Sequence, residues 1–376
     1  MDISALLAQM STEHASDVFL SHGAPPAIVV AGVPRFIGDK ALTPIDTHEI
    51  AYSIMSDRQQ KEFEATLEMS LGIAPAGLGR FRVSIYRQRG EIAIAIRYIP
   101  TEIPSIETLR LPDTLQRLIM LPRGLILVVG ATGSGKSTTL ASMLDYRNRT
   151  KGGHILTIED PVEYLHQHRK SIIDQREVGI DTLSYANALR NAMREAPNVI
   201  MIGEIRDRET MQQAISYAET GHLCLSTLHA NNANQTLDRI LNFFPEAAHK
   251  NVLMNLSLNL KAVISLRLVV GKDGKRLPAS EVLINTPMIR DLIRRGEVHE
   301  VKDAMDKSLQ EGMHTFDQSL FRMYKEGKIE LEEALRKADS RDGLALKIRL
   351  AEGGSGEHDP YADMYGGGAD KQSSGF

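Results

Sequence analysis

A glycine-rich segment that ends in a lysine and two hydroxyl residues has the clearest chemistry in the chain. It satisfies the pattern G-x-x-x-x-G-K-[ST], follows the apolar run 125–129 and precedes a segment, 138–146, of helical composition. Between a strand and a helix, the backbone N–H groups of such a loop point at phosphate oxygens. The lysine would reach the β- and γ-phosphates, and the serine hydroxyl would hold Mg²⁺. The residues expected to bind a nucleoside triphosphate are Gly130, Ala131, Thr132, Gly133, Ser134, Gly135, Lys136, Ser137 and Thr138.

An acidic cluster follows the apolar segment 154–158. A triphosphatase needs one carboxylate to orient water and another group to bind the metal ion. Glu159, Asp160 and Glu163 surround Pro161, which has no N–H to donate to a sheet and therefore ends the strand. Ligands of open α/β sheets bind at the C-terminal edge of the strands, so the cluster is a candidate for this chemistry. The alternative is a solvated acidic turn.

A further candidate carboxylate is Glu204, which follows the apolar residues 199–202. Four apolar residues and then an acid are typical of the strand that brings a metal-binding carboxylate to a phosphate loop. The departure is Gly203, because many such strands carry Asp at that place. Glu204 is then the single acid at the end of a strand that often carries two. This favours Glu163, from the other acidic segment, as the catalytic base.

Two histidines bracket another apolar segment, 223–228. His222 and His229 are seven positions apart, and an odd separation along a continuous strand puts two side chains on opposite faces. Joint ligation of a metal ion by this pair is therefore not expected. A histidine at the end of such a strand could sense the γ-phosphate or stabilise a subunit contact; the alternative is a satisfied polar residue.

The composition changes along the chain in a way that predicts several structural units. Prolines punctuate the stretch before the phosphate loop, strands then alternate with helices, and apolar residues recur at helical spacing near the end. The expected units are an α+β domain at 1–100, a linker with a short helix near Leu115 at 101–122, an α/β core at 123–286, a helical region at 287–351 and a disordered tail at 352–376.

Within residues 1–100, helical patterning covers 47–69. Two apolar segments, 81–86 and 92–97, predict a pair of strands around a turn at 88–90.

Charge and cysteine content limit the possible functions. The 376 residues include 44 basic and 48 acidic side chains, a formal charge of −4, which argues against broad nucleic-acid binding. The single cysteine, Cys224, excludes an intramolecular disulfide and a multi-cysteine zinc site. The first residues do not resemble a signal peptide, and no run approaches about 18 consecutive apolar residues. We therefore expect a cytoplasmic protein without membrane insertion.

Together these segments resemble the secretion-type ring ATPases, specifically the type IV pilus retraction family. The phosphate loop is similar to its Walker A motif, ILTIEDPVEYLH (155–166) to its Asp box, VIMIGEIRD (199–207) to its Walker B motif and TGHLCLSTLH (220–229) to its His box. Order and spacing agree, and the resemblance covers roughly residues 1–350. The segment INTPMIRDLIRRGEV and the low-complexity tail are more similar to the paralogue of the main retraction motor than to that motor.

The resemblance implies an α/β fold in which a PAS-like α+β domain precedes a RecA-like P-loop ATPase domain with C-terminal helices. It implies a homo-hexamer that binds ATP and Mg²⁺ between the two domains. Hydrolysis would rotate one domain against the other and move the inner-membrane pilus platform protein, which is PilC-like. A PilT-like paralogous motor would be a second partner. The protein would lie in the cytoplasm, peripheral to the inner membrane at the pilus base.

Carried onto this sequence, the resemblance implies Glu163 as general base and Glu204 as the acid at Mg²⁺. Arg82 and Arg97 occupy the places of N-terminal arginines that stabilise charge near the triphosphate in the family. The two histidines of 220–229 become sensor or coupling residues.

Several alternatives stay open. Pilus assembly and type II secretion ATPases resemble the chain too, but usually carry a four-cysteine zinc element that one cysteine cannot supply. A regulatory ring subunit that binds nucleotide and hardly hydrolyses it is a second alternative. A nucleic-acid translocase on the same core is disfavoured by the acidic balance and the lack of a basic aromatic groove. A small-molecule kinase is disfavoured by the Asp and His boxes.

Overall fold

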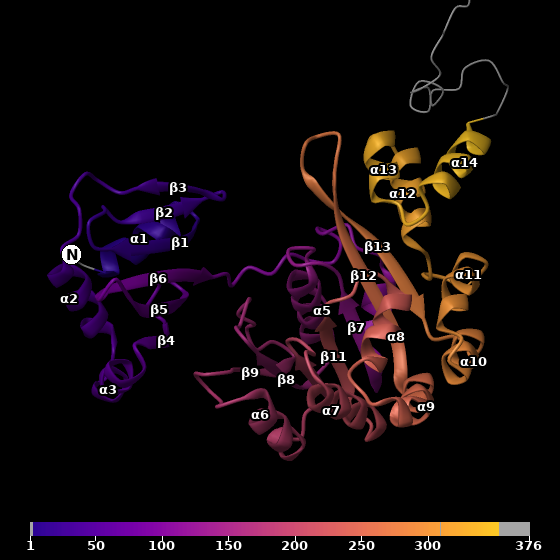
Figure 1. Cartoon of the computed structure of the whole chain (residues 1–376), viewed down its shortest axis with the longest axis horizontal. Helices are drawn as coiled ribbons and strands as arrows, with labels where there is room; N and C mark the ends of the chain where they lie inside the picture. Colours follow the sequence, from indigo (N-terminus) through magenta and orange to yellow (C-terminus); the bar gives the residue numbers. More distant parts are fainter. Residues whose placement is uncertain (1–2, 309, 353–376) are drawn as a thin grey trace, which may run out of the picture.

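The computed structural model describes residues 3–308 and 310–352. Figure 1 shows two β-sheets, one on either side of an extended connecting segment, with further helices at the C-terminal end. The predicted disordered tail lies outside the described residues, apart from its first residue.

The N-terminal sheet has six strands in the order β3-β2-β1-β6-β5-β4, and all neighbouring strands are antiparallel. One apolar cluster lies between this sheet and its helices. The strands are β1 (Ala15–Ser21), β2 (Ala27–Val30), β3 (Val33–Phe36), β4 (Glu68–Ile73), β5 (Arg80–Gln88) and β6 (Glu91–Ile99). The helices are α1 (Ile3–Thr12), α2 (Pro44–Ile54) and α3 (Asp57–Thr66).

The predicted helical stretch over 47–69 is wrong in its extent. It is two helices, α2 and α3, and β4 begins at Glu68. The break has a local cause, because the Ser56 hydroxyl accepts from the Gln59 N–H while the Gln59 side chain accepts from the Ser56 N–H. Such a capping box starts a new helix at the residue that follows it.

The predicted strand pair is confirmed as the antiparallel hairpin β5–β6. At its tip, Arg89 and Gly90 have φ angles of 54° and 84°. Two consecutive positive φ angles are the geometry of the tight turn whose twist matches the flanking strands.

The second sheet has seven strands in the order β13-β12-β7-β11-β10-β8-β9. Its neighbours are parallel except for β12 and β13, so the predicted parallel α/β sheet is confirmed with an antiparallel edge strand added. The strands are β7 (Gly124–Val129), β8 (Gly153–Glu159), β9 (Ser171–Glu177), β10 (Val199–Ile202), β11 (Leu223–Leu228), β12 (Leu260–Val270) and β13 (Arg276–Ile284).

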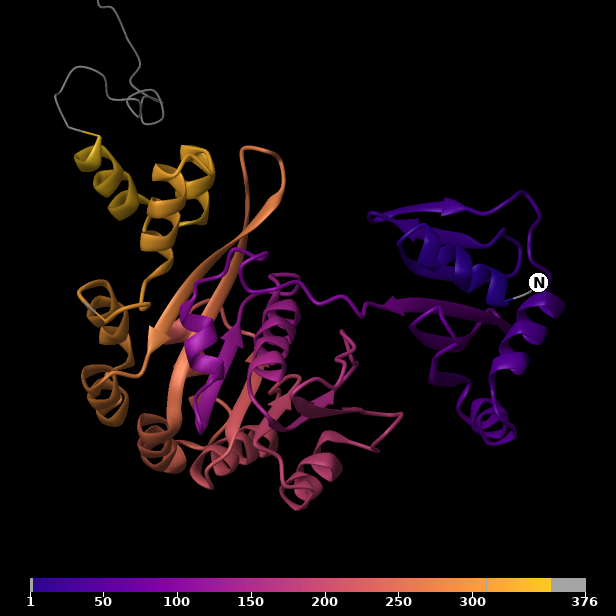
Figure 2. The same ribbon diagram turned by 180° about the vertical axis from the view of Figure 1, so that it is seen from behind.

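Helices cover both faces of this sheet, which explains why its central strands are buried at every position and mostly apolar. In β7, Leu125, Leu127 and Val129 pack into one core cluster, while Ile126 and Val128 pack into the cluster on the other face. Figure 1 looks onto the face covered by α7 (Arg208–Glu219), α8 (Ala233–Leu241) and α9 (His249–Asn259), and Figure 2 shows α4 (Thr114–Ile119) and α5 (Lys136–Thr150) on the opposite face. Helix α4 is the short helix predicted near Leu115.

Helix α6 (Tyr185–Ala192) lies beside α7. The remaining helices come after β13 in the chain. The apolar residues of the last three helices, within 316–351, form a separate cluster against the outer ends of β12 and β13. Those of the two helices before them belong to a core cluster of the seven-stranded sheet. These C-terminal helices are α10 (Pro287–Arg295), α11 (Val301–Asp306), α12 (Phe316–Lys325), α13 (Leu331–Lys337) and α14 (Arg341–Ala351).

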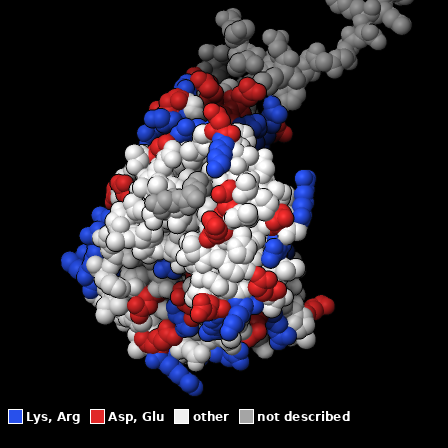
Figure 3. Space-filling view, turned by 90° about the vertical axis from the view of Figure 1, so that its left-hand side faces the viewer, with Lys and Arg blue, Asp and Glu red and all other residues white. Residues whose placement is uncertain are grey.

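On the face seen in Figure 3, with the N-terminal part nearest the viewer, acidic and basic side chains are interspersed around a largely uncharged centre. Among the described residues, no helix combines the length and apolarity that a bilayer crossing requires. Cys224 is buried in β11, as its apolar neighbours predict.

Candidate nucleotide-binding site

The phosphate loop joins the buried strand β7 to helix α5, which begins at Lys136. Gly133 and Gly135 have φ angles of +75° and +97°, which a residue with a Cβ rarely adopts. The buried hydroxyl of Ser134 has no hydrogen-bond partner among the described residues, although buried polar groups are normally paired. The left-handed glycines and this unpaired hydroxyl fit a loop built to surround an anionic ligand.

Lys136 is folded back onto the loop that precedes it. Its Nζ donates to the Gly130 carbonyl at 2.9 Å and to the Ala131 carbonyl at 3.0 Å. Burial lowers the pKa of Lys136, and the negative charge of Glu204 opposes that shift. The ammonium group is thus held by neutral carbonyls, which phosphate oxygens can replace with stronger charge-assisted bonds.

A cavity of about 560 Å³ lies in front of the loop at the C-terminal edge of the sheet. The ends of β8, β10 and β11 form its other walls, as expected for an open α/β sheet. The predicted site residues among its lining are Thr132, Gly133, Gly135, Lys136, Ser137, Thr138, Glu163, Glu204 and His229. Gly130 and Ala131 line an adjacent hollow that His229 shares.

Both carboxylate oxygens of Glu204 contact a side chain. His229 Nε2 lies 2.7 Å from its Oε1, and Arg206 Nε donates to its Oε2 at 2.6 Å. Arg206 also lies 3.9 Å from Asp160. A metal ion that binds Glu204 must therefore compete with two cationic or polar partners.

The absence of a second acid at position 203 has a steric reason. A Cβ on Gly203 would lie 2.8 Å from the Tyr185 hydroxyl, 3.2 Å from the Glu159 Cα and 3.3 Å from the Ile158 carbonyl oxygen. The Tyr185 side chain would have to shift and the neighbouring backbone to give by a few tenths of an ångström, so a side chain is disfavoured at this position between β10 and β8. The described residues also contain no group of three or more His, Cys, Asp and Glu arranged for a metal ion. Ser137 and Glu204 both line the cavity and are groups that could hold Mg²⁺ beside the phosphates.

The acidic cluster after β8 separates into a buried and an exposed part. Glu159 is 7% exposed and accepts hydrogen bonds from Thr157 at 2.7 Å and Gln175 at 3.2 Å. Burial raises its pKa to about 7, and hydrogen bonds, including one from the Glu163 N–H, oppose the shift. The Glu163 side chain is exposed and lines the cavity. Glu159 therefore anchors the backbone that carries Glu163.

The two histidines lie at opposite ends of β11. His229 follows its C-terminal end and reaches the cavity. His222 precedes its first residue, where the ring lies 3.1 Å from the Thr220 hydroxyl and packs edge-on against Tyr217. A six-residue strand spans about 20 Å, so His222 is not brought to the cavity of its own chain.

The two predicted arginines lie on one face of the N-terminal sheet, as cross-strand partners in β5 and β6. Arg97 donates to Asp17 of β1 at 2.7 Å. Arg82 reaches the second sheet, where its Nε lies 3.7 Å from the buried carboxylate of Glu177 at the end of β9. Neither arginine lines the cavity of this chain.

Residues 3–276 match the model of the Type II/IV secretion system protein family. The chain belongs to this family. It is 49% identical over 359 residues to the type IV pilus ATPase PilU of Pseudomonas aeruginosa, which covers 95% of this chain and 94% of that protein. It is 44% identical over 338 residues to the retraction ATPase PilT of the same organism, covering 90% and 98%.

Among solved structures, the chain is similar to the crystal structure of the pilus retraction motor PilT with bound ADP. The TM-score is 0.85 at 44% identity, and the match covers 91% of this chain and 98% of that one. These relatives confirm the predicted membership in the PilT and PilU type of secretion ATPase. They also confirm the predicted fold class, an N-terminal domain followed by an ATPase domain with C-terminal helices.

Sequence reasoning did not assign Arg206, Tyr185 or the separate role of Glu159. The contact of Arg206 could have been predicted from sequence, because a cation two positions after the candidate acid Glu204 can reach its carboxylate. The contact of Tyr185 could not, since it begins a helix, α6, that only the tertiary fold brings against Gly203.

Proposed function

We propose that this chain is the subunit of an ATP-hydrolysing motor that powers or assists type IV pilus retraction. The observation that carries the proposal is the single cavity that joins the phosphate loop to Glu163 and Glu204. Its relatives PilU and PilT, which cover nearly the whole chain, are the second line of support.

In the proposed reaction, the loop N–H groups and Lys136 bind the β- and γ-phosphates after Lys136 leaves the loop carbonyls. Ser137 and Glu204 would hold Mg²⁺, which would neutralise charge that develops on the phosphate oxygens. Glu163 orients the attacking water and accepts its proton, since its carboxylate is exposed within the cavity. His229 moves between Glu204 and the γ-phosphate and so senses the state of the nucleotide.

We assign the charge-stabilising role of Arg82 and Arg97 to a closed ring of six identical subunits. Neither residue lines the cavity of its own chain, and heterologous contacts that close on themselves generate such a ring. His222, at the far edge of the sheet, would act at a subunit contact.

The ring would act at the cytoplasmic side of the inner membrane, beside a PilT-like paralogous motor and against a PilC-like platform protein.

The test is steady-state ATP hydrolysis by the purified chain, with and without EDTA. Glu163→Gln and Glu204→Gln are expected to lower kcat by about 100-fold or more, as for loss of a catalytic group. Glu219→Gln, an exposed carboxylate at the end of α7, is the matched control and should keep wild-type kcat. Equal low rates in all four proteins would contradict the proposal and favour the regulatory ring subunit.

A further inference from the structure

A buried carboxylate outside the nucleotide cavity has no part in the chemistry above. Glu281 of β13 is 1% exposed, and its cross-strand partner Ser265 in β12 donates a hydrogen bond to its Oε1 at 3.1 Å. Burial raises the pKa of Glu281 to about 7. A carboxyl group in a sheet interior is costly unless it is hydrogen-bonded, so its partners indicate what it does there.

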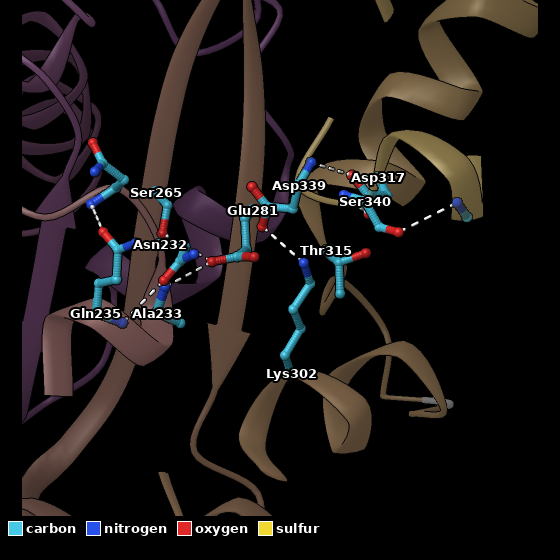
Figure 4. A network of polar contacts seen from close by, with 12 residues as sticks. Asn232, Ala233, Gln235, Ser265, Glu281, Lys302, Thr315, Asp317, Asp339 and Ser340 are labelled. Atoms are coloured by element: carbon cyan, nitrogen blue, oxygen red, sulfur yellow. Dashed lines mark hydrogen bonds and ion pairs between the residues drawn. The ribbon is translucent and has the colours of Figure 1, made fainter. Parts of the chain in front are cut away.

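Its second partner is the start of helix α8. The Ala233 N–H donates to the same Oε1 at 2.8 Å. Ala233 is the first residue of the helix, so this N–H has no partner within the helix, and the helix N-terminus also favours a negative charge. The Asn232 side chain caps the same end by accepting from the Gln235 N–H at 2.9 Å. Figure 4 shows Glu281 reaching this end from the neighbouring strand.

This capped end is separated from the nucleotide cavity by a short connection. Residues 230–232 join His229 to α8, and His229 Nε2 lies 2.7 Å from Glu204. The His229 side chain is 49% exposed, so packing alone does not fix the ring. Its position depends on where the backbone of 230–232 is held.

The same connection is bonded to the C-terminal helices. Arg267 of β12 donates to the Asn231 carbonyl at 3.4 Å and pairs with Asp339 at 2.5 Å. Asp339 also pairs with Lys302 of α11 at 2.9 Å, and its N–H donates to Asp317 of α12 at 2.8 Å. The segment between His229 and α8 is therefore held from two sides, by the buried Glu281 and, through Arg267, by this charged network. Figure 4 shows Glu281 beside Ala233, and Asp339 with Lys302 and Asp317.

We propose that Glu281 is a positioning residue for His229: by binding the first N–H of α8, it fixes 230–232 and sets the His229 ring against Glu204. The consequence for hydrolysis rests on the proposed function, in which Glu204 and His229 act on the nucleotide. The positioning itself does not, so the two can be tested separately.

The direct test is hydrogen exchange of the full chain without nucleotide. In Glu281→Ala, the Ala233 N–H loses its buried acceptor, and amides of 230–236 should exchange about 10-fold faster. A tenfold change corresponds to about 1.4 kcal/mol, which lies within the usual range for such a loss. Glu281→Gln keeps an oxygen acceptor and should retain wild-type protection.

Glu333→Ala is the matched control, because Glu333 is also buried and accepts from a backbone N–H, that of Val270, at 2.9 Å. Unchanged exchange of 230–236 in Glu281→Ala would overturn the proposal. So would an equal loss of protection throughout the domain in Glu281→Ala and Glu333→Ala.

The kinetic test is a double-mutant cycle with His229→Ala. Glu281→Ala should lower kcat about 10-fold or more and change the KM for ATP less than about 3-fold, because a misplaced group affects the chemical step. Adding it to His229→Ala should cost nothing further, whereas independent, additive losses would overturn the proposal. If wild type hydrolyses ATP and His229→Ala is unimpaired, the role given to His229 fails, and the exchange result still decides the positioning.

Discussion

Replacing Glu159 by glutamine should change how the stability of the protein depends on pH. Glu159 lies in the wall of the nucleotide cavity, 7% exposed, and its pKa is raised by burial from 4.5 to about 7. Gln has the same shape and can still accept from Thr157 through its carbonyl oxygen. The substitution therefore removes the ionisation while keeping most of the packing.

The sign follows from proton linkage. Between pH 4.5 and 7 the folded state holds the Glu159 proton while the unfolded state has lost it, so the free energy of unfolding falls as pH rises through this range. A pKa change of this size corresponds to roughly 3 kcal/mol, most of which is lost between pH 5 and pH 8. Glu159→Gln lacks this loss.

The assay is chemical denaturation at pH 5 and pH 8 without nucleotide, comparing wild type, Glu159→Gln and the exposed control Glu219→Gln. Relative to wild type, Glu159→Gln should be more stable at pH 8 than at pH 5 by roughly 2–3 kcal/mol. Wild type and Glu219→Gln should show the same decline. Glu281, whose pKa is also about 7, leaves a residual decline in every protein. An identical pH dependence in wild type and Glu159→Gln would refute the assignment of Glu159 as a buried, mostly protonated acid.

Three further changes test the site. Lys136→Ala should weaken ADP binding, measured by calorimetry, by at least about 10-fold without lowering the melting temperature; unchanged affinity would contradict its role at the phosphates. Gly203→Ala should lower the free energy of unfolding by about 1–3 kcal/mol, because the new Cβ would contact the Tyr185 hydroxyl. The control Gly152→Ala, whose nearest contact would be 3.5 Å, should change it by less than about 0.5 kcal/mol. Equal melting temperatures would show that the structure around Gly203 can adapt to a side chain. Arg206→Ala should lower the Mg²⁺ concentration for half-maximal hydrolysis about 2- to 5-fold, since Glu204 loses a competing donor, and a higher requirement would contradict this.

The nucleotide loop and the strands around it could be predicted from sequence because their signals are local. A five-residue apolar run before a glycine-rich loop defines β7, and acids after apolar runs mark the C-terminal edge of the same sheet. Sequence order alone is then enough to bring Glu163, Glu204 and His229 to one cavity, because parallel strands end at the same edge.

Other features depend on tertiary contacts that no local pattern encodes. Three acids within five residues give no indication that Glu159 is the buried one, since that depends on Thr157 and on Gln175 of the next strand. His222 and His229 are separated by the length of β11, and only His229 lies at the end of the strand that forms the cavity. The position of Arg82 beside Glu177 depends on how two sheets meet, which hydrophobic periodicity cannot specify.

The central claim is that hydrolysis at this site drives pilus retraction. The most direct measurement compares surface pili and twitching in a strain that lacks this chain and is complemented with wild type, Glu163→Gln or Glu219→Gln, with and without the PilT-like paralogue. We expect surplus, non-retracting pili with Glu163→Gln, and normal pili and twitching with wild type and Glu219→Gln. Loss of pili with Glu163→Gln would point to assembly, and full retraction with it in both backgrounds would contradict a motor powered at this site.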